Sequence, residues 1–176
     1  ADLGWGTANA QPVTLSFWVR SSLTGTFNVA FGNSAANRVY VASYTVSSAN
    51  TYEYKTISIP GDTSGTWLTT NGTGIGLWWD LGSGSGRTVS GGAWSGTYGV
   101  RTSGSVQLVA TNGATFYITG VQLEEGTAAS PFEFRQYGVE LQLCQRYFQP
   151  IVNYVGTSQS STEFLASYRL NVPMRS

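Results

Sequence analysis

Flat aromatic side chains are the residues of this sequence whose type and spacing suggest binding chemistry. Trp78 and Trp79 are adjacent in an apolar run, so on a strand they point to opposite faces. Sugar rings pack flat C–H faces on aromatic planes, while their hydroxyl groups need polar partners. We therefore predict a glycan-binding set, against the alternative that each ring packs in the core. The set is Trp67, Trp79, Trp94, Tyr98 and Asp80.

Carboxylates offer the only route to catalysis that the sequence leaves open. A glycosidase needs two carboxyl groups about 5–10 Å apart, and Asp80 with Glu124 or Glu125 would supply them. The simpler interpretation is that Asp80 caps a strand or turn and that the two glutamates are solvated. The chain contains no His, which removes Ser-His-Asp and Cys-His arrangements and the commonest metal ligand. We expect a protein that is not an enzyme.

Metal and thiol chemistry are equally restricted. The single cysteine, Cys144, cannot form an internal disulfide or a zinc site, and we expect a buried, inert thiol. Asp62 follows the turn at Pro60-Gly61, and a structural Ca²⁺ there is a minor alternative. Otherwise we expect no cofactor and no metal.

The composition indicates an all-β protein. Of 176 residues only 10% are charged, against about 25% in an average soluble chain, while 14% are aromatic and 22 are Gly. The formal net charge is zero and there is no basic run, which disfavours nucleic-acid binding. The apolar runs are far shorter than the 18 or so residues of a membrane span, so we expect no membrane insertion.

Alternating apolar and polar residues predict seven short strands separated by Gly-rich turns. In the first, Val13, Leu15, Phe17 and Val19 face one way and Thr14, Ser16, Trp18 and Arg20 the other. The predicted strands are 13–20, 26–31, 38–46, 53–60, 75–81, 106–110 and 115–124. The stretch 82–104 reads as a long, irregular loop. We predict a jelly-roll β-sandwich over residues 1–126.

The pattern changes after residue 126. We predict a connector over 127–136, an amphipathic helix over 137–149 and a partial second β-rich region over 150–176, with strands at 151–155 and 163–172. The apolar stripe of the helix either packs on the sandwich of its own chain or forms a seam about a three-fold axis. The stripe is Val139, Leu143, Cys144, Tyr147 and Phe148.

Three segments, residues 6–22, 56–67 and 114–126, resemble a jelly-roll module of tail-fibre and other virion proteins of tailed bacteriophages. Residues 130–135 and 140–148 resemble the hinge and helix that follow this module in such proteins, and the most specific part is Glu140-Leu-Gln-Leu-Cys-Gln-Arg-Tyr147. The module is itself similar to carbohydrate-binding jelly rolls of polysaccharide-degrading enzymes. Because such modules have strand sequence upstream of Asp2, the resemblance leads us to expect an excerpt of a longer polypeptide, with a gap in the core that another segment fills.

The resemblance implies a non-catalytic virion structural protein, a tail fibre or related appendage. It would form homotrimers, contact other virion proteins, and attach to host surface polysaccharide on the extracellular particle after assembly in the host cytoplasm. Two alternatives stay open: a capsid or neck decoration protein with a mainly structural role, and a carbohydrate-binding module from a polysaccharide-degrading enzyme.

Overall fold

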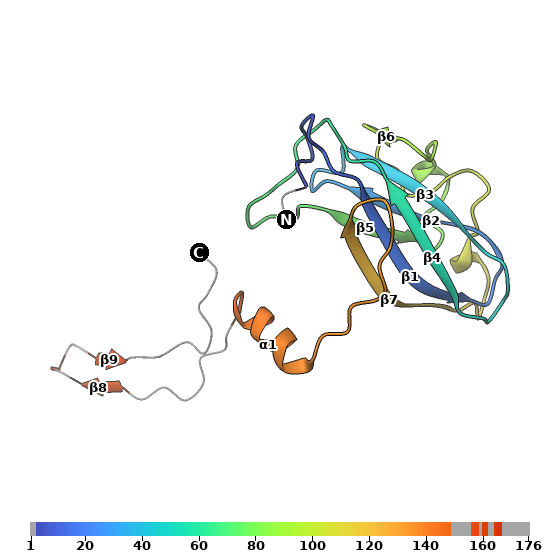
Figure 1. The fold of residues 1–176 in the computed structure, drawn as a ribbon. Coiled ribbons are helices and arrows are strands. Elements are labelled where there is room, and N and C mark those ends of the chain that lie inside the picture. Colours follow the sequence, from blue (N-terminus) through green and yellow to red (C-terminus); the bar gives the residue numbers. More distant parts are fainter. Residues whose placement is uncertain (1–2, 149–155, 159, 162–163, 167–176) are drawn as a thin grey trace. The chain divides into compact units, whose positions relative to one another are not determined.

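The computed structural model describes residues 3–148, 156–158, 160–161 and 164–166. The chain forms two compact units, Ala1–Phe132 and Glu133–Ser176, which we describe separately (Figure 1). Among the described residues, the first unit holds nearly all of the regular structure, and the second contains the α-helix α1 near its start.

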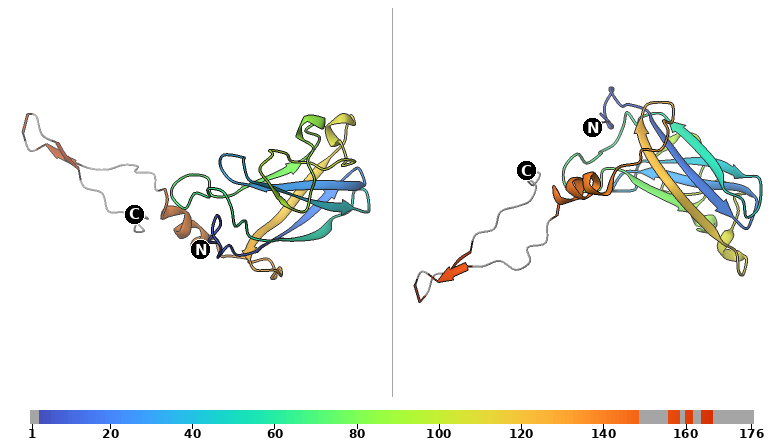
Figure 2. Two further views of the ribbon diagram at one scale, coloured as in Figure 1. Left: turned by 90° about the horizontal axis from the view of Figure 1, so that it is seen from above. Right: turned by 60° about the horizontal axis from the view of Figure 1, so that its bottom comes forward.

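The first unit consists of two antiparallel sheets, which confirms the predicted all-β class. Sheet A has the strand order β4-β1-β7, and sheet B has the order β5-β2-β3-β6. Figure 2 shows the two sheets as separate layers. The strands are β1 (Val13–Ser21), β2 (Gly25–Gly32), β3 (Val39–Val46), β4 (Glu53–Ile59), β5 (Gly76–Asp80), β6 (Trp94–Ser95) and β7 (Phe116–Glu125).

The main core lies between the sheets, where the alternating residues of the strands meet. On β1 the four predicted inward residues, from Val13 to Val19, are at most 1% exposed. On β2 the core contributes Phe27, Val29 and Phe31. Phe17 of sheet A makes edge-to-face ring contacts with Tyr44 and Trp79 of sheet B, at centroid distances of 5.2 and 5.7 Å. The two sheets therefore pack face to face through interlocking aromatic rings.

A second, smaller core covers the opposite side of sheet B. The outward residues Ala30, Val39 and Val41 are buried together with Val100, and the half-buried Trp78 and Val89 pack against them. Val89 and Val100 belong to the predicted irregular loop 82–104, which includes the short 3₁₀ helix η1 (Ser85–Arg87). Sheet B is thus covered on both faces, and this loop has a structural role.

The strand predicted at 106–110 is wrong. The amide of Val106 donates to the carbonyl of Thr26, but Leu108–Ala110 form the 3₁₀ helix η2, and the amide of Val109 donates to the carbonyl of Leu81. Because one end of the segment bonds to β2 and the other to the residue after β5, no ladder forms. Leu108 is buried and Val109 is exposed, so this turn shows the same alternation of burial as a strand, which explains the wrong prediction.

The edge strand β7 leaves part of the core side of sheet A accessible to solvent. Its register with β1 shifts between Ser16 and Trp18, where Gly120 adopts a φ of +57°, a left-handed conformation that glycine accommodates without strain. Beyond this bulge Leu123 pairs with the buried Leu15 and so points inward, yet it is 37% exposed. β7 pairs with β1 alone among the described strands and forms an edge of sheet A.

In the second unit, helix α1 (Tyr137–Gln145) is shorter than the predicted 137–149. The amides of Tyr147 and Phe148 both donate to the carbonyl of Cys144, so the chain turns there. Pro150 follows closely and disfavours helical backbone before it. Cys144 is exposed within this chain, so the expected buried thiol is wrong.

A short hairpin of β8 (Gly156–Ser158) and β9 (Phe164–Ala166) completes the described part of this unit. β9 falls within the strand predicted at 163–172, whereas the strand predicted at 151–155 lies outside the described residues. Among the described residues, no helix has the length and hydrophobicity that crossing a membrane requires.

Candidate functional site

The outer face of sheet A carries a cluster of exposed rings that we call the aromatic face. Its four aromatic residues are each 43–46% exposed, although they lie on or next to regular strands. A guanidinium, that of Arg20, lies among them. The aromatic face consists of Trp18, Arg20, Tyr52, Tyr54 and Tyr117.

Strand alternation places these side chains. On the central strand β1, Trp18 and Arg20 occupy the positions between the buried Phe17, Val19 and Ser21, and so point away from the core. The antiparallel register sets Trp18 opposite Tyr54 of β4 and Arg20 opposite Tyr117 of β7. All three strands of sheet A or their ends therefore contribute to one surface.

The rings and the guanidinium are in contact with one another. The centroids of Trp18 and Tyr54 are 5.3 Å apart with an interplanar angle of 48°. The Arg20 Cζ atom lies 5.3 Å from the centroid of Tyr117 and 6.0 Å from that of Tyr52. Cation–π contacts of this kind fix the orientation of a side chain that would otherwise be free.

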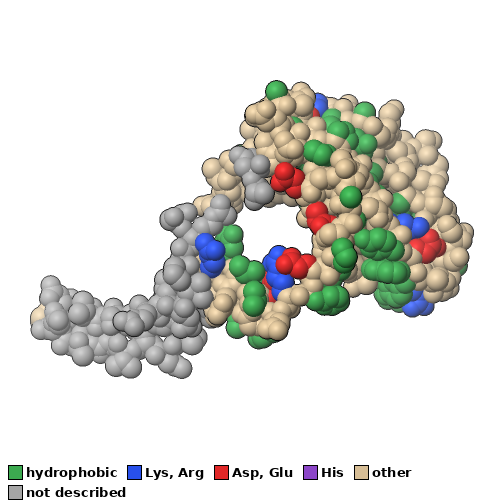
Figure 3. Space-filling model, in the orientation of Figure 1, with side chains coloured by type: hydrophobic (Ala, Val, Ile, Leu, Met, Phe, Trp, Pro, Cys, Tyr) green, Lys and Arg blue, Asp and Glu red, His purple; other side chains and the backbone are tan. Residues whose placement is uncertain are grey.

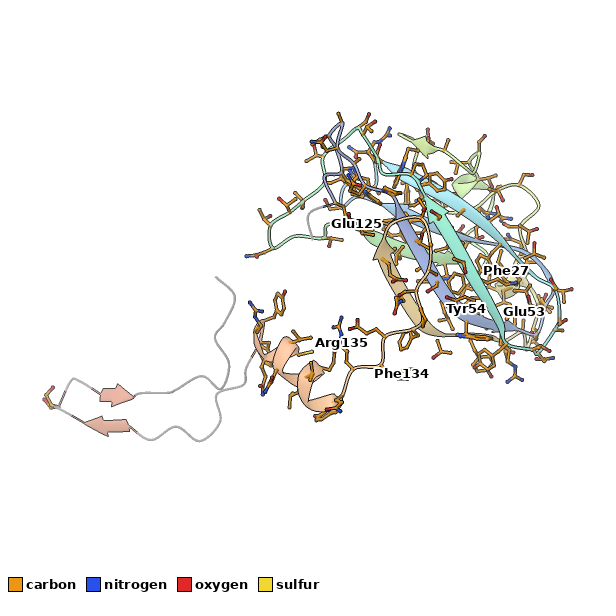
Figure 4. All side chains as sticks on the ribbon, in the orientation of Figure 1. Phe27, Glu53, Tyr54, Glu125, Phe134 and Arg135 are labelled. Atoms are coloured by element: carbon orange, nitrogen blue, oxygen red, sulfur yellow. The ribbon has the colours of Figure 1, made fainter. Side chains whose placement is uncertain are left out.

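Polar groups border the rings. Thr119 is paired with Trp18 on the β7 side, and Thr56 follows Tyr54 by two residues on β4; both are exposed. In Figure 3, which has the orientation of Figure 1, hydrophobic side chains gather over this sheet, and Figure 4 labels Tyr54 on β4. Exposed rings beside hydroxyl groups can hold a sugar, because the rings cover its C–H face and the hydroxyls bind its oxygens.

Two residues of the predicted glycan-binding set, Trp67 and Trp94, lie together and are not part of the aromatic face. Their ring centroids are 5.4 Å apart, and both pack edge to face on Trp5, at 4.6 and 5.2 Å. Trp67 Nε1 donates to the carbonyl of Ser64, and Trp94 Nε1 donates to that of Pro60. Both indoles are half-buried and serve to close one end of the sandwich.

The other two predicted rings lie on opposite faces of sheet B. Trp79 points into the main core against Phe17, and its Nε1 atom is buried without a hydrogen-bond partner among the described residues. Tyr98 is 36% exposed and packs on Trp78, 6.4 Å away, with Arg87 4.5 Å above its ring. The adjacent tryptophans 78 and 79 point to opposite faces, as predicted, but the predicted set does not form one surface.

The fifth predicted residue, Asp80, cannot reach a ligand on the surface because its side chain is fully buried. Its Oδ1 atom accepts hydrogen bonds from the amides of Gly82 and Ser83, and its Oδ2 atom lies 3.9 Å from Arg101 Nε. Asp80 therefore caps the turn that opens the long loop. Glu124 accepts hydrogen bonds from the amide and hydroxyl of Ser130, so both Asp80 and Glu124 have structural partners.

The carboxylate of Asp62 is neutralised by an arginine, and this does not fit the calcium alternative. Arg38 donates from Nε and Nη2 to the two oxygens, at 2.7 and 2.6 Å, which raises the pKa of Arg38. The Ser64 amide donates to the same buried carboxylate. The described part of the chain contains no group of three or more His, Cys, Asp or Glu side chains that would hold a metal.

A concave region lies on the long loop 82–104 over sheet B. It has a volume of about 800 Å³ and is lined by small residues, six of which carry hydroxyl groups, with the indole of Trp94 at one side. It holds no charged side chain. The hydroxyl-bearing residues are Thr88, Ser90, Ser95, Thr97, Thr102 and Ser103.

The aromatic face was missed at the sequence level although its signal was present. The alternation of residues 13–20 already placed Trp18 and Arg20 on the side opposite to the core. Tyr52 and Tyr117 lie 32 and 97 residues after Arg20 in the sequence. Only the pairing of β1 with its neighbouring strands brings them next to Arg20.

Comparisons with known proteins found no family model, no curated protein and no solved structure that matches this chain.

Proposed function

We propose that this protein is a non-catalytic virion protein of a tailed bacteriophage, a tail fibre or related appendage, that binds host surface polysaccharide through the aromatic face. The β-sandwich would be of the jelly-roll type. The observation that carries the binding proposal is the group of four rings, each 43–46% exposed, on one face of a three-stranded sheet. The phage origin is supported by the sequence resemblance alone.

Exposed aromatic rings on a rigid sheet suit carbohydrate recognition. Strand backbones hold the rings in fixed places, so little conformational entropy is lost on binding. Trp18 and Tyr54 offer adjacent planes for consecutive sugar rings, and Thr56 and Thr119 offer hydroxyl groups at the borders. Proteins rarely leave such rings in water together without a ligand or partner.

Helix α1 supports the proposed trimer. Val139 is 49% exposed and Leu143 36% exposed, and Tyr147 and Phe148 just beyond the helix are exposed as well. Two further copies of the chain, packed about a three-fold axis, would cover these side chains and Cys144. Three weak sugar sites on one particle appendage would then gain avidity through effective concentration.

The first experiment measures binding of the full chain to immobilised polysaccharides from bacterial surfaces. Wild-type protein is compared with Trp18→Ala and Tyr54→Ala, and with Tyr98→Ala as a matched control that removes an exposed ring elsewhere. We expect each of the first two variants to lose at least about tenfold in affinity, which corresponds to roughly 1.4 kcal/mol, and Tyr98→Ala to bind like wild type. Loss of binding in Tyr98→Ala alone would contradict the proposed face.

A further control fills the hydroxyl-lined concave region on the loop 82–104. Ser103 is exposed at its wall, and Ser103→Tyr adds a ring there without touching sheet A. Unchanged binding supports the aromatic face, whereas loss of binding would move the site to this concave region.

The mass of the protein in solution tests the assembly and separates the alternatives. A trimer that becomes monomeric in Leu143→Glu supports a fibre-like appendage. A monomer at all concentrations fits a carbohydrate-binding module of a polysaccharide-degrading enzyme, and a trimer without glycan binding fits a capsid or neck decoration protein.

A further inference from the structure

Arg20 is a cation without an acidic partner on the aromatic face. No described carboxylate forms an ion pair with it. Three other cations of the first unit have buried or half-buried side chains, and each of them is paired with an acidic residue. These three pairs are Arg38–Asp62, Lys55–Glu53 and Arg101–Asp80. The charge of Arg20 is therefore left for something outside the described chain.

The surroundings hold the guanidinium in place. It lies between the rings of Tyr52 and Tyr117, and its Nε atom is buried with no hydrogen-bond partner among the described residues. Neither of its two Nη atoms has a hydrogen bond in the described structure, and neither is among the buried unpaired atoms. The terminal edge of the guanidinium is thus accessible from outside and presents parallel N–H donors to which a ligand can bind.

The carboxylates nearest in sequence and register do not reach this edge. Glu53 pairs with Val19, whose side chain points inward, and its oxygens bind Lys55 and the amides of Ser47 and Ser48. Glu124 points outward but pairs with Thr14, six residues from Arg20 along β1, or about 20 Å at the rise of a strand. The face around Arg20 is locally positive.

We propose that the aromatic face selects an acidic polysaccharide, with the carboxylate of a uronic acid bound by the two Nη atoms of Arg20 and a neighbouring sugar ring stacked on Trp18 and Tyr54. The side chains of Arg20 and Trp18 point to the same face of β1, two residues or about 7 Å apart along the strand. The planar fork of a guanidinium matches the two oxygens of a carboxylate. The inference rests on the proposed function, because it names the ligand class of the same face.

The test compares each acidic polysaccharide of the binding panel with its carboxyl-reduced form, in which every uronic acid has become the neutral sugar with the same ring and linkages. Polysaccharides that carry phosphate but no carboxylate form a separate arm. The full chain is assayed as wild type, Arg20→Gln, Arg20→Lys, and Arg87→Gln as the control for loss of another arginine that stacks on a tyrosine.

We expect wild-type protein and Arg87→Gln to bind at least one acidic polysaccharide about tenfold or more tightly than its reduced form, with a preference that weakens as salt increases. Arg20→Gln should bind both forms with the affinity that wild type has for the reduced form. Arg20→Lys should keep part of the preference, because it keeps the charge without the fork. Binding of the reduced form by Arg20→Gln shows that the variant is folded.

Three results would overturn the inference while leaving the proposed function intact: equal binding of acidic and reduced forms by wild type, a preference that survives in Arg20→Gln, or binding only in the phosphate arm. Absence of binding to every polysaccharide by wild-type protein would overturn the proposed function, and the inference with it.

Discussion

The indole of Trp18 and the phenol ring of Tyr54 lie side by side on the outer face of sheet A, with centroids 5.3 Å apart. The pair arises from the register of β1 with β4, which places the two residues directly opposite each other. Neither ring contributes to the core clusters of the sandwich. Their contact is thus available for a role other than holding the fold together.

The first prediction compares two adjacent residues of β1. Trp18→Ala should lower the free energy of unfolding by about 1 kcal/mol or less, because Trp18 is exposed on the outer face. Phe17→Ala should lower it by about 3–5 kcal/mol, because Phe17 is fully buried against Tyr44 and Trp79. Denaturant unfolding of the two variants measures both values. Equal losses would show that Trp18 supports the fold, and would weaken its assignment to binding.

The second prediction concerns the attachment of loop 82–104 to sheet B. The buried Asn28 donates from Nδ2 to Ser43 Oγ and Thr102 Oγ1, at 2.8 and 3.2 Å, and accepts from the Thr102 amide at 2.9 Å. Asn28→Ala leaves that amide without its partner, so we expect a loss of about 2–3 kcal/mol in unfolding free energy.

Hydrogen exchange gives the sharper measurement for Asn28→Ala. The amides of Val89 and Val100, which donate to the carbonyls of Arg101 and Arg87, should exchange faster than in wild type, while the amides of β1 keep their protection relative to global stability. Ser103→Ala, at an exposed position of the same loop, is the matched control. Unchanged exchange of Val89 and Val100 would mean that the second core holds the loop without Asn28.

Local alternation was sufficient to predict the class of the fold. The inward residues of β1, β2 and β3 follow period two, and the predicted strands there agree with the observed ones to within one or two residues at each end. The pair Trp78 and Trp79 also follows directly from this period, since adjacent strand residues must point apart. Period two is a property of the strand itself and needs no tertiary information.

The rest depended on contacts between distant segments. A tryptophan in a loop can bind a ligand or close the core, and only packing on Trp5 shows that Trp67 and Trp94 close the core. The sequence alone does not show whether Asp80 faces a ligand-binding cleft or caps a turn. Its burial beside Arg101 in the structure shows that it caps a turn. The aromatic face needed the β1–β4 and β1–β7 registers, which no local pattern specifies.

The third prediction concerns acid stability. Hydrogen bonds from Lys55, and from the amides of Ser48 and Ser47, lower the pKa of Glu53. A carboxylate whose pKa is lower in the folded state stabilises the fold above its unfolded pKa, near 4.3. That contribution is lost as the pH falls through the lower folded value. The melting temperature of the wild-type protein should therefore decrease when the pH is lowered below about 4.5.

Glu53→Gln tests this assignment. The variant should have a lower midpoint than wild type at pH 7, and the gap should close as the pH falls toward 3. Glu125→Gln, at an exposed position on β7, should follow the wild-type curve. A constant gap between Glu53→Gln and wild type from pH 7 to pH 3 would show that the carboxylate charge of Glu53 contributes nothing to stability.

The last prediction concerns the hydroxyl group of Tyr44, which is buried without a hydrogen-bond partner among the described residues. Burial, with the nearby charge of Asp80, raises the pKa of Tyr44. In the unfolded chain a tyrosine ionises near pH 10. Because the folded pKa is higher, the stability contributed by the neutral phenol is complete below pH 10 and is lost as the pH rises toward the folded value.

Tyr44→Phe removes this hydroxyl and keeps the ring that contacts Phe17 and Phe27 at 5.2 and 5.9 Å. At pH 7 the variant should be more stable than wild type by about 1 kcal/mol, because an unpaired polar group is no longer buried. Between pH 9 and 11 its unfolding free energy should decline less steeply than that of wild type. Tyr98→Phe, which removes a phenol from a more exposed ring, is the control. A loss of stability in Tyr44→Phe at pH 7 would show that the hydroxyl has a partner, such as an ordered water, that stabilises the core.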